Sequence, residues 1–545
     1  MKQILALLLI SLTATAQYPK GIEHVVIIGV DGMSPDGICN ASTPVLHKMI
    51  SNGSVKWNVR TVLPSSSSPN WASMIMGAGV EQHGITDNDW GRGEYSLPAI
   101  VRNEDGIFPT IFGVVHNSYP TAPIAAVYHW DGFGRLFEKS AVSYDKTFST
   151  EDSTTTDFVR YLQAKKPLFA FLHLDHVDGA GHEHGHGSTE YYHAVAKADS
   201  LIGEVLTAIK KAGIENSTLV IVTADHGGIG YGHGGATIEE AEIAMILYGK
   251  DIRKGYNIPE QAATYDLAAT IAFALKIVPP YVWIGRPLKS AFEGFNPPSN
   301  LWMGKSMIAA PVIEPKRQLY QQAGGLYINT SAHVVIKPVA ENAVTRYTLD
   351  GSEPTETSTV YTTPFILKTS AVVRAKSFDT KKNESMAAIA YFRMVDSTAG
   401  NGLHVQFYKG KDWKYLPVFK DLTPVKEWNT YEFALNREQL LPILGNTFGA
   451  VFNGYLRIDT AGEYTFYNSS DDGSKLFVDG QEVVNNDGDH GVIERSGSIK
   501  LSVGKHAIRI EYYNGNGGFW LDAYYKGPGL YKQLIPADKL FLDKK

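Results

Sequence analysis

The sequence predicts an α/β fold, a doubly wound sheet followed by two all-β sandwich domains. Three observations support this prediction. Buried apolar runs alternate with helical patterns from about residue 22 to residue 290, short alternating strands with turn residues follow them, and histidines and aspartates stand where several apolar runs end. Alternating strands and helices are typical of a parallel sheet, and ligands of such sheets gather at the carboxyl ends of the strands.

Five apolar runs have the length and the boundaries of buried parallel strands. They lie at residues 24–32, 122–130, 168–175, 218–227 and 243–249. Between them, the stretch "STPVLHKMISNG" predicts a helix with Pro44 in its first turn and Gly53 as its stop. A longer helix is expected from Ser188 to Gly213. Strands and helices therefore alternate through the first half of the chain.

The run "LPSSSSPNW" at residues 63–71 predicts the start of a further helix. Pro69 suits the first helical position, apolar residues follow it, and Gly77 ends the pattern. Ser68 is then expected at the N-cap, with Ser67 just ahead of it. Because the N-terminus of a helix holds anions and makes a hydroxyl easier to ionise, this run is a candidate active-site turn.

The composition describes a folded protein of several domains that is not directed at nucleic acid. The chain has 545 residues with 44% hydrophobic and 19% charged residues, a formal net charge of −6 and no long basic run. Residues 1–16 have the pattern of a cleavable signal peptide, and no later segment is apolar enough to span a membrane. We therefore expect an exported protein, periplasmic or extracellular, whose single Cys39 forms no internal disulfide.

Residue types that bind zinc gather in three stretches beyond the predicted strands. The stretch "HLDHVDGAGHEHGHG" at 173–187 holds five of the 17 histidines, "TADHGGIGYGHGG" at 223–235 holds an aspartate and two histidines, and Asp31 ends the first strand. Imidazole and carboxylate together are a ligand set that suits zinc. With the serine run, four segments deliver such groups to one edge of the sheet.

Residues 22–300 resemble the alkaline phosphatase superfamily, specifically its type I phosphodiesterase/nucleotide pyrophosphatase branch. The matching motifs are "GVDG" (29–32), "SSPN" (67–70), "DGAGH" (178–182), "DHG" (225–227) and "HGG" at 233. The resemblance implies an alkaline-phosphatase-like sheet with two zinc ions. It assigns Asp178, His182 and His233 to one ion and Asp31, Asp225 and His226 to the other, with Ser67 as the nucleophile that also meets a metal.

This resemblance implies a two-step hydrolysis of a phosphoric ester. Zinc lowers the pKa of the Ser67 hydroxyl, the alkoxide attacks phosphorus, and water then hydrolyses a phosphoseryl intermediate. Asn70 is expected to donate to a phosphate oxygen. We expect a preference for diesters over monoesters, because no Arg or Lys lies between Thr61 and Gly91 to meet a second phosphate charge. The remaining residues of the histidine-rich stretch are expected to support the ligands or lie at the surface: His173, Asp175, His176, His184 and His186.

The second half of the chain resembles two β-sandwich families. Residues 310–395 resemble the chitobiase/hexosaminidase C-terminal domain through "YTLDGSEPT", and residues 401–535 resemble the anthrax protective-antigen domain through "SSDDGSKLFVDGQEVVNN". The latter resemblance implies a glycan ligand and, through Asp471 and Asp472, a possible calcium site; turn chemistry explains the two aspartates equally well. Because every candidate ligand precedes residue 234, residues 20–300 alone are expected to be catalytically sufficient.

Other functions remain open on the sequence. A phosphomonoesterase would share both metals. A glycan-binding adhesin with a degenerate enzyme domain would explain the β-modules, although all six candidate ligands and Ser67 are present. A sulfatase fits less well, since Trp71 stands where that branch requires arginine. The leading hypothesis is an exported two-zinc phosphodiesterase.

Overall fold

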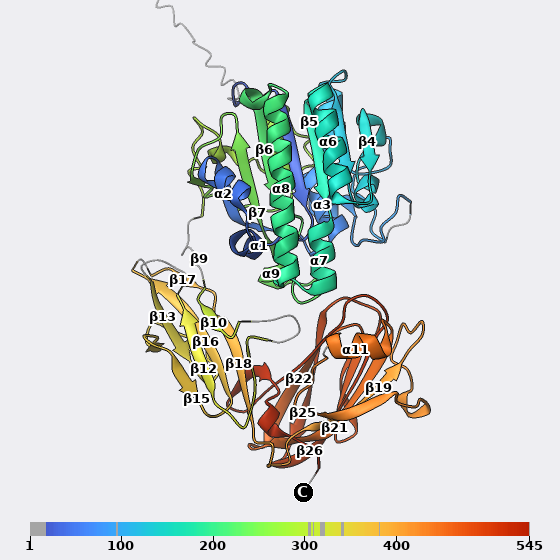
Figure 1. The fold of residues 1–545 in the computed structure, drawn as a ribbon, viewed down its shortest axis with the longest axis vertical. Helices are drawn as coiled ribbons and strands as arrows, with labels where there is room; N and C mark the ends of the chain where they lie inside the picture. Colours follow the sequence, from blue (N-terminus) through green and yellow to red (C-terminus); the bar gives the residue numbers. More distant parts are fainter. Residues whose placement is uncertain are drawn as a thin grey trace, which may run out of the picture.

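The structure, a computed structural model, describes residues 18–93, 96–302, 307–308, 310–316, 322–338, 343–380, 382–435 and 437–543. The predicted signal peptide lies outside these residues. Within them, no helix is both long and apolar enough to cross a bilayer. An α/β part lies at one end of the molecule, and two strand-rich parts lie next to each other at the other end (Figure 1).

The α/β part is built on an eight-stranded sheet. Its strands are β1 (His24–Val30), β2 (Ser54–Arg60), β3 (Ile124–Tyr128), β4 (Tyr144–Thr147), β5 (Phe169–Leu174), β6 (Thr218–Thr223), β7 (Glu242–Gly249) and β8 (Tyr256–Asn257). They lie in the order β4-β3-β5-β1-β6-β7-β2-β8. The five strands from β4 to β6 in this order are parallel, so their carboxyl ends meet at one edge.

All five predicted strands are present, but the fifth runs in the opposite direction to the prediction. β7 is antiparallel to β6, and β2 is antiparallel to β7. The reason is the connection between β6 and β7, whose only helix is α9 (Ile238–Ala241). Four residues cannot cross the face of a sheet, so the chain turns back beside β6. β2, β4 and β8 were not predicted, because their sequences lack a continuous apolar run.

Helices cover both faces of the sheet. They are α1 (Pro35–Asn40), α2 (Pro44–Ser51), α3 (Ser67–Met76), α4 (Val80–His83), α5 (Ile111–Ser118), α6 (Glu151–Lys165), α7 (His176–His184), α8 (Thr189–Lys211), α9 and α10 (Asp266–Ala274). α6, α7, α8 and α2 pack together, whereas α3, α5 and α10 form a second group (Figure 1). The doubly wound α/β architecture is therefore confirmed. α8 begins where predicted, since the Ser188 hydroxyl accepts the Tyr191 N–H at 3.0 Å.

α3 begins two residues earlier than the sequence predicted. Ser66, not Ser68, is the N-cap, and Ser67 is the first helical residue. Pro69 falls in the first turn, where its missing N–H is one of the groups that lack a helical partner in any case. Gly77 ends the helix in the left-handed conformation, with φ 59°. The shift places Ser67 on the helix itself, at its N-terminal end.

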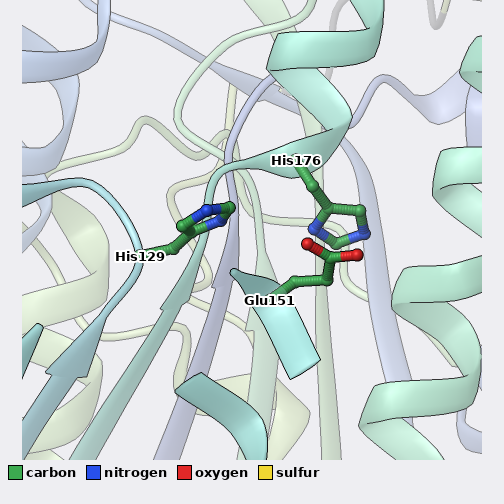
Figure 2. Close-up of side chains that lie close together, drawn as sticks. All are labelled: His129, Glu151 and His176. Atoms are coloured by element: carbon green, nitrogen blue, oxygen red, sulfur yellow. The ribbon is translucent and has the colours of Figure 1, made fainter. Parts of the chain in front are cut away.

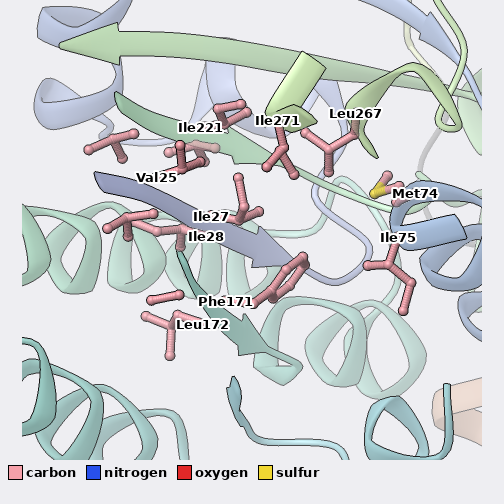
Figure 3. Close-up of a cluster of buried hydrophobic side chains, with 14 of the residues drawn as sticks. Val25, Ile27, Ile28, Met74, Ile75, Phe171, Leu172, Ile221, Leu267 and Ile271 are labelled. Carbon is pink, nitrogen blue, oxygen red and sulfur yellow. The ribbon is translucent and has the colours of Figure 1, made fainter. Parts of the chain in front are cut away.

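The core beneath the carboxyl edge includes side chains from the central strands and from α3 and α10 (Figure 3). Ile27 of β1, Phe171 of β5 and Ile221 of β6 are fully buried, and Ile75 of α3 and Ile271 of α10 pack with them. Truncating such a side chain to alanine typically costs about 2–5 kcal/mol. The strand ends that carry the polar residues are thus fixed by a rigid support.

The two strand-rich parts have separate hydrophobic cores. The first contains β9 (Met307–Ile308), β10 (Val312–Glu314), β11 (Gly324–Ile328), β12 (Ala332–Lys337), β13 (Ala343–Thr348), β14 (Thr359–Val360), β15 (Phe365–Leu367), β16 (Ala371–Asp379), β17 (Glu384–Ser385) and β18 (Ala388–Val395). These strands form a three-stranded and a seven-stranded sheet.

The second strand-rich part, here called the third module, also has two sheets. It contains β19 (Leu403–Lys409), β20 (Lys426–Thr430), β21 (Phe448–Ile458), β22 (Gly462–Asp471), β23 (Ser474–Val478), β24 (Gln481–Asn486), β25 (Ile493–Leu501), β26 (Gly504–Asn514), β27 (Trp520–Gly527), β28 (Leu530–Leu534), β29 (Leu540–Phe541) and the helix α11 (Arg437–Leu444). Two strand-rich parts therefore follow the α/β core, as predicted.

Candidate metal centre

The carboxyl edge of the sheet brings together all seven side chains that the sequence singled out as ligands or nucleophile. They come from the ends of β1 and β6, from the start of α3, from α7 and from the loop after β6: Asp31, Asp225, His226, Ser67, Asp178, His182 and His233. All except His233, which lies in the loop between β6 and α9, are on or within three residues of a helix or strand that packs on the core. Their contacts divide these residues into two groups.

The first group surrounds the Nε2 atom of His226. This nitrogen lies 3.3 Å from Asp31 Oδ1, 3.2 Å from Asp225 Oδ2 and 3.2 Å from the Ser67 hydroxyl. The other ring nitrogen, Nδ1, donates to the Gly227 carbonyl at 2.7 Å. Asp31, Asp225 and His226 are all buried. The imidazole is therefore oriented by the backbone, with Nε2 aimed at two carboxylates and a hydroxyl.

The second group surrounds the Nε2 atom of His182. It lies 3.2 Å from Asp178 Oδ2 and 3.2 Å from Nε2 of His233. In both rings Nδ1 again faces the backbone, the Tyr231 carbonyl at 2.7 Å for His182 and the Ser65 carbonyl at 3.0 Å for His233. The rings of His226 and His233 stack at 3.7 Å, so the two groups are adjacent.

These contacts fit metal ions better than protein hydrogen bonds alone. A neutral imidazole whose Nδ1–H donates to a carbonyl has a bare lone pair at Nε2, and here three such nitrogens face carboxylates or one another. Three carboxylate oxygens are buried without a hydrogen-bond partner among the described residues: Asp31 Oδ1, Asp178 Oδ1 and Asp225 Oδ2. Neighbouring ligands of a tetrahedral zinc lie about 3.3 Å apart, which the observed contacts match.

The electrostatics of the cluster also indicate a missing positive charge. Burial, and then the nearby Asp31 carboxylate, raise the pKa of Asp225 well above its ordinary value. Burial alone would raise the pKa of Asp31, but the neighbouring imidazoles of His173 and His226 outweigh burial and lower it well below its ordinary value. The Asp178 carboxylate raises the pKa of His182 to about 9, whereas burial lowers that of His233 to about 3. A divalent cation would let these carboxylates and imidazoles coexist in their ligating forms.

Residues outside the ligand set orient Asp31. The Trp71 indole N–H donates to Asp31 Oδ2 at 3.0 Å, and His173 Nε2 donates to the same oxygen at 3.2 Å. Trp71 and His173 are both fully buried. The sequence predicted a supporting role for His173. It predicted no role for Trp71, which served only as an argument against a sulfatase. Its position on α3, one turn after Ser67, is the signal that could have revealed it.

The structure contradicts the expected role of Asn70. Its Oδ1 accepts the Val62 N–H at 2.8 Å, and its Nδ2 lies 3.0–3.3 Å from the carbonyl oxygens of Val62, Pro64 and Ser66. Both amide hydrogens are thus committed to the loop before α3, and none is left for a phosphate oxygen. Asn70 is fully buried and holds this loop in place.

A different asparagine, Asn88, contacts the start of α3. Its Oδ1 accepts the Ser68 N–H at 2.8 Å, which fixes the amide next to the start of α3. The side chain is half-buried, and its Nδ2 makes no hydrogen bond within the part of the chain that the structure describes. Sequence reasoning missed Asn88, because it arrives from a loop 20 residues further along the chain and belongs to no motif quoted above.

The rest of the histidine-rich stretch has separate environments. His184 lies at the surface, 3.7 Å from Glu183. His186 is buried, with Nε2 at 3.9 Å from Asp178 Oδ1. Burial and the Asp31 charge raise the pKa of Asp175 to about 7. Asp175 and His186 thus lie beside the cluster, whereas His176 belongs to a different group of side chains.

The third module lies against the loop that carries His233. Gly518 meets this loop, because a Cβ built on it would come within 3.3 Å of the Tyr231 carbonyl oxygen. A Cβ built on Gly232 would lie 3.8 Å from Asp471 Oδ2. The Tyr231 carbonyl is the group that orients His182. The third module therefore lies against the loop that positions two candidate ligands, and the sufficiency of residues 20–300 stays a prediction.

The two aspartates of the third module differ from each other. Asp472 is buried, and its two oxygens accept the backbone N–H groups of His490 at 2.9 Å and Gly515 at 2.8 Å. This matches the turn interpretation of the sequence. Burial and the Asp472 charge raise the pKa of Asp471, which His182 opposes. Asp471 Oδ2 thus lies beside Gly232, in the loop that carries His233.

The fold and the cluster define an α/β protein with a candidate metal centre at the carboxyl edge of its sheet. Comparison with protein families then identifies the parts. Residues 25–233 match the type I phosphodiesterase / nucleotide pyrophosphatase family, residues 322–389 the chitobiase/beta-hexosaminidase C-terminal domain, and residues 437–539 the PA14 domain. The chain thus contains a domain of the phosphodiesterase/nucleotide pyrophosphatase family followed by these two modules, as the motifs predicted.

Curated relatives match the same region. Venom phosphodiesterase CdcPDE of Crotalus durissus collilineatus is 25% identical over 229 residues, which cover 39% of this chain and 28% of that protein. Ectonucleotide pyrophosphatase/phosphodiesterase family member 3 of Rattus norvegicus is 24% identical over 228 residues, 39% of this chain and 26% of the relative. The match therefore spans less than a third of the length of either relative.

Solved structures give a weaker comparison. Murine ectonucleotide pyrophosphatase/phosphodiesterase 5 is 16% identical, with a TM-score of 0.41, and the match covers 47% of this chain and 96% of that one. A likeness at this level supports no inference about the site.

Proposed function

We propose that this protein is an exported two-zinc phosphodiesterase of the nucleotide pyrophosphatase type that acts through Ser67. The relatives support a phosphodiesterase-type hydrolase. The observation that carries the finer proposal is the convergence of three Nε2 atoms, each turned by a backbone carbonyl toward unpaired carboxylate oxygens. Export rests on the pattern of residues 1–16 and accords with the venom and ectoenzyme names of the relatives.

The donor sets divide the residues between two ions. Asp178, His182 and His233 would hold one zinc, and Asp31, Asp225 and His226 the other, with Ser67 beside the second. When bound, the zinc ions supply Lewis acidity that lowers the pKa of the serine hydroxyl and neutralises negative charge on the phosphate. Indole and imidazole N–H groups from Trp71 and His173 keep the Asp31 carboxylate oriented for this task.

Ser67 is placed to act as the nucleophile. Its hydroxyl lies at the N-terminal end of α3, where the helix dipole favours an anion, and 3.2 Å from His226 Nε2. In the first step a bond forms from Ser67 Oγ to phosphorus, and the bond from phosphorus to the leaving oxygen breaks. In the second step the oxygen of water attacks phosphorus, and the Ser67 hydroxyl is regenerated. Burial of Ser67, at 6% exposure, limits competing access of bulk water.

Asn88 replaces Asn70 in the proposed mechanism. The Ser68 N–H fixes its Oδ1, so the amide nitrogen remains the group available to a phosphate oxygen beside Ser67. A neutral amide donor suits the single charge of a diester. In the described structure, every ion pair of Asp31, Asp178 and Asp225 is with a histidine, so no arginine or lysine enters the cluster through them.

Hydrolysis of matched substrates tests the proposal. The full-length protein, loaded with zinc, is assayed with an aryl phosphate monoester and the corresponding alkyl aryl diester. We expect a higher kcat/KM for the diester. A clear preference for the monoester would instead identify a phosphomonoesterase with the same metals. Absence of both activities together with absence of stoichiometric zinc would indicate an adhesin with a degenerate enzyme domain.

A glycan ligand for the two β-modules is a further proposal, which rests on their families alone. Calcium at Asp471 and Asp472 has less support, because backbone N–H groups already occupy both Asp472 oxygens. Glycan-array binding by the full-length protein, with and without calcium, tests both points.

A further inference from the structure

A second group of metal-binding side chains lies beside the candidate centre, at the same edge of the sheet. His129 follows β3, Glu151 is the first residue of α6, and His176 is the first residue of α7. The three side chains point toward one another from these separate elements (Figure 2). One potential ligand atom from each lies within 4.8 Å of the other two. None of the three residues belongs to the centre described above.

One ring nitrogen of each histidine in this group lacks a partner. Nδ1 of His129 and Nδ1 of His176 are both buried, and neither makes a hydrogen bond with the residues that the structure describes. In His176 the other nitrogen, Nε2, lies 3.2 Å from the Ala194 carbonyl oxygen. Because a carbonyl only accepts, Nε2 carries the proton and Nδ1 presents a bare lone pair. His129 likewise has a hydrogen bond to the backbone of Ser149.

The hydrogen bonding of this group matches that of metal ligands. Because Nε2 of His176 donates to a carbonyl, its Nδ1 is left in the unprotonated form in which imidazole binds a metal. A backbone carbonyl behind each imidazole is the usual outer partner of a metal-bound histidine. The glutamate adds the negative charge that such a site requires.

We propose that His129, Glu151 and His176 bind a third divalent transition-metal ion, with zinc as the expected occupant. Two imidazole nitrogens and one carboxylate are a recognised zinc ligand set.

The proposed ion has a structural consequence for the candidate centre. It would link the starts of α6 and α7 to His129, the residue that follows β3. The backbone N–H of His129 also donates to the His173 carbonyl at 3.1 Å. α7 carries Asp178 and His182. The ion would therefore fix the helix that presents two candidate ligands, without touching the substrate.

The number of zinc ions per chain, measured in the wild type and in a variant that lacks the candidate centre, tests this inference independently of the proposed function. The full-length protein is loaded with zinc, desalted and analysed by inductively coupled plasma mass spectrometry. We expect three zinc ions per chain in the wild type and two in His129→Ala. The double variant Asp31→Ala/Asp178→Ala should retain one ion, and adding His129→Ala should remove it. His193→Ala, which removes an exposed histidine of α8, is the matched control and should not change the count.

The outcomes separate the two claims. Equal zinc content in the wild type and in folded His129→Ala would overturn the third site. So would a folded double variant that holds no zinc. If the double variant keeps three ions, the assignment of the candidate centre fails, and the His129→Ala comparison in the wild-type background still decides the third site. Glu151→Gln, which preserves shape and removes only the charge, serves if His129→Ala does not fold, with the same loss of one ion expected.

Discussion

The α/β part and the third module each contain two adjacent polar residues near the end of a strand, followed by glycine. The two regions differ in whether the buried carboxylate oxygens have hydrogen-bond partners. At the end of β6, Asp225 keeps one buried oxygen without a hydrogen-bond partner and faces the bare side of His226. At the end of β22, both oxygens of Asp472 accept backbone N–H groups. The same residue type thus prepares a ligand site in one region and closes a loop in the other.

This difference shows that the satisfaction of polar atoms, and not residue type, separates a metal site from a turn. Burying a carboxylate is costly unless hydrogen bonds or a cation compensate. In the third module, backbone N–H groups of the loops supply the hydrogen bonds that compensate for burial of the Asp472 carboxylate. In the α/β part the compensation must come from protons or metal ions, and the imidazole lone pairs favour metal ions.

The largest expected effect concerns the nucleophile. Ser67→Ala should lower kcat for the diester by about 10⁴-fold or more, because it removes the group that forms the covalent intermediate. Zinc content should stay at the wild-type value, since each ion keeps three protein ligands. Steady-state kinetics and metal analysis measure both quantities. Ser67→Thr, which keeps a hydroxyl, is the control; substantial turnover by folded Ser67→Ala would contradict the assignment.

Substitution of Asp225 and of Asp472 gives the most direct contrast between the two regions. Asp225→Asn should lose one zinc ion and reduce activity by about 10³-fold, since a charged ligand is replaced by a weak one. Asp472→Asn should keep all zinc and instead lower the free energy of unfolding by about 1–3 kcal/mol, because one backbone N–H loses its acceptor. Metal analysis and urea denaturation separate the effects. Zinc loss in Asp472→Asn alone would reverse the comparison.

A second pair of variants separates Asn88 from Asn70. Asn88→Ala should lower kcat by about 10²–10³-fold if the amide donates to a phosphate oxygen. Asn70→Ala should mainly lower stability, by about 1–3 kcal/mol, because it strips partners from buried groups of the loop before α3. Kinetics below the unfolding temperature and thermal denaturation measure the two effects. A catalytic defect in Asn70→Ala with unchanged stability would restore its original role.

The smallest effect is expected for Trp71→Phe. This change keeps the aromatic ring in the core and removes only the N–H that donates to Asp31. Loss of such an outer partner typically weakens metal binding or activity by about 10–100-fold. Competition with a graded chelator series measures zinc affinity. An affinity equal to that of the wild type would show that His173 alone orients the carboxylate.

Much of this architecture could be predicted from the sequence, because buried strands and long helices leave strong periodic patterns. β1, β5 and β6 follow continuous apolar runs, and α8 begins at its serine cap. The direction of β7 could not be predicted, since it depends on the length of a connection whose helix is only four residues. The start of α3 was misplaced because Pro69 is tolerated anywhere in the first turn.

The candidate site divides in the same way. Ser67 and the six ligand candidates lie in short motifs, so the sequence could name them. Asn88 and Trp71 act through contacts that only the folded chain creates, one with the Ser68 backbone and one with Asp31. The contact of the third module with the loop at Tyr231 is equally invisible in the sequence, because it joins residues almost 300 positions apart along the chain.

Anomalous X-ray scattering from crystals of the full-length, zinc-loaded protein tests the central claim most directly. Data collected on both sides of the zinc absorption edge locate the ions independently of activity. We predict one peak among Asp31, Asp225 and His226 and a second among Asp178, His182 and His233. Zinc-loaded crystals with no peak at either position, the seven side chains being in the arrangement described, would contradict the proposal that these residues form a two-metal centre.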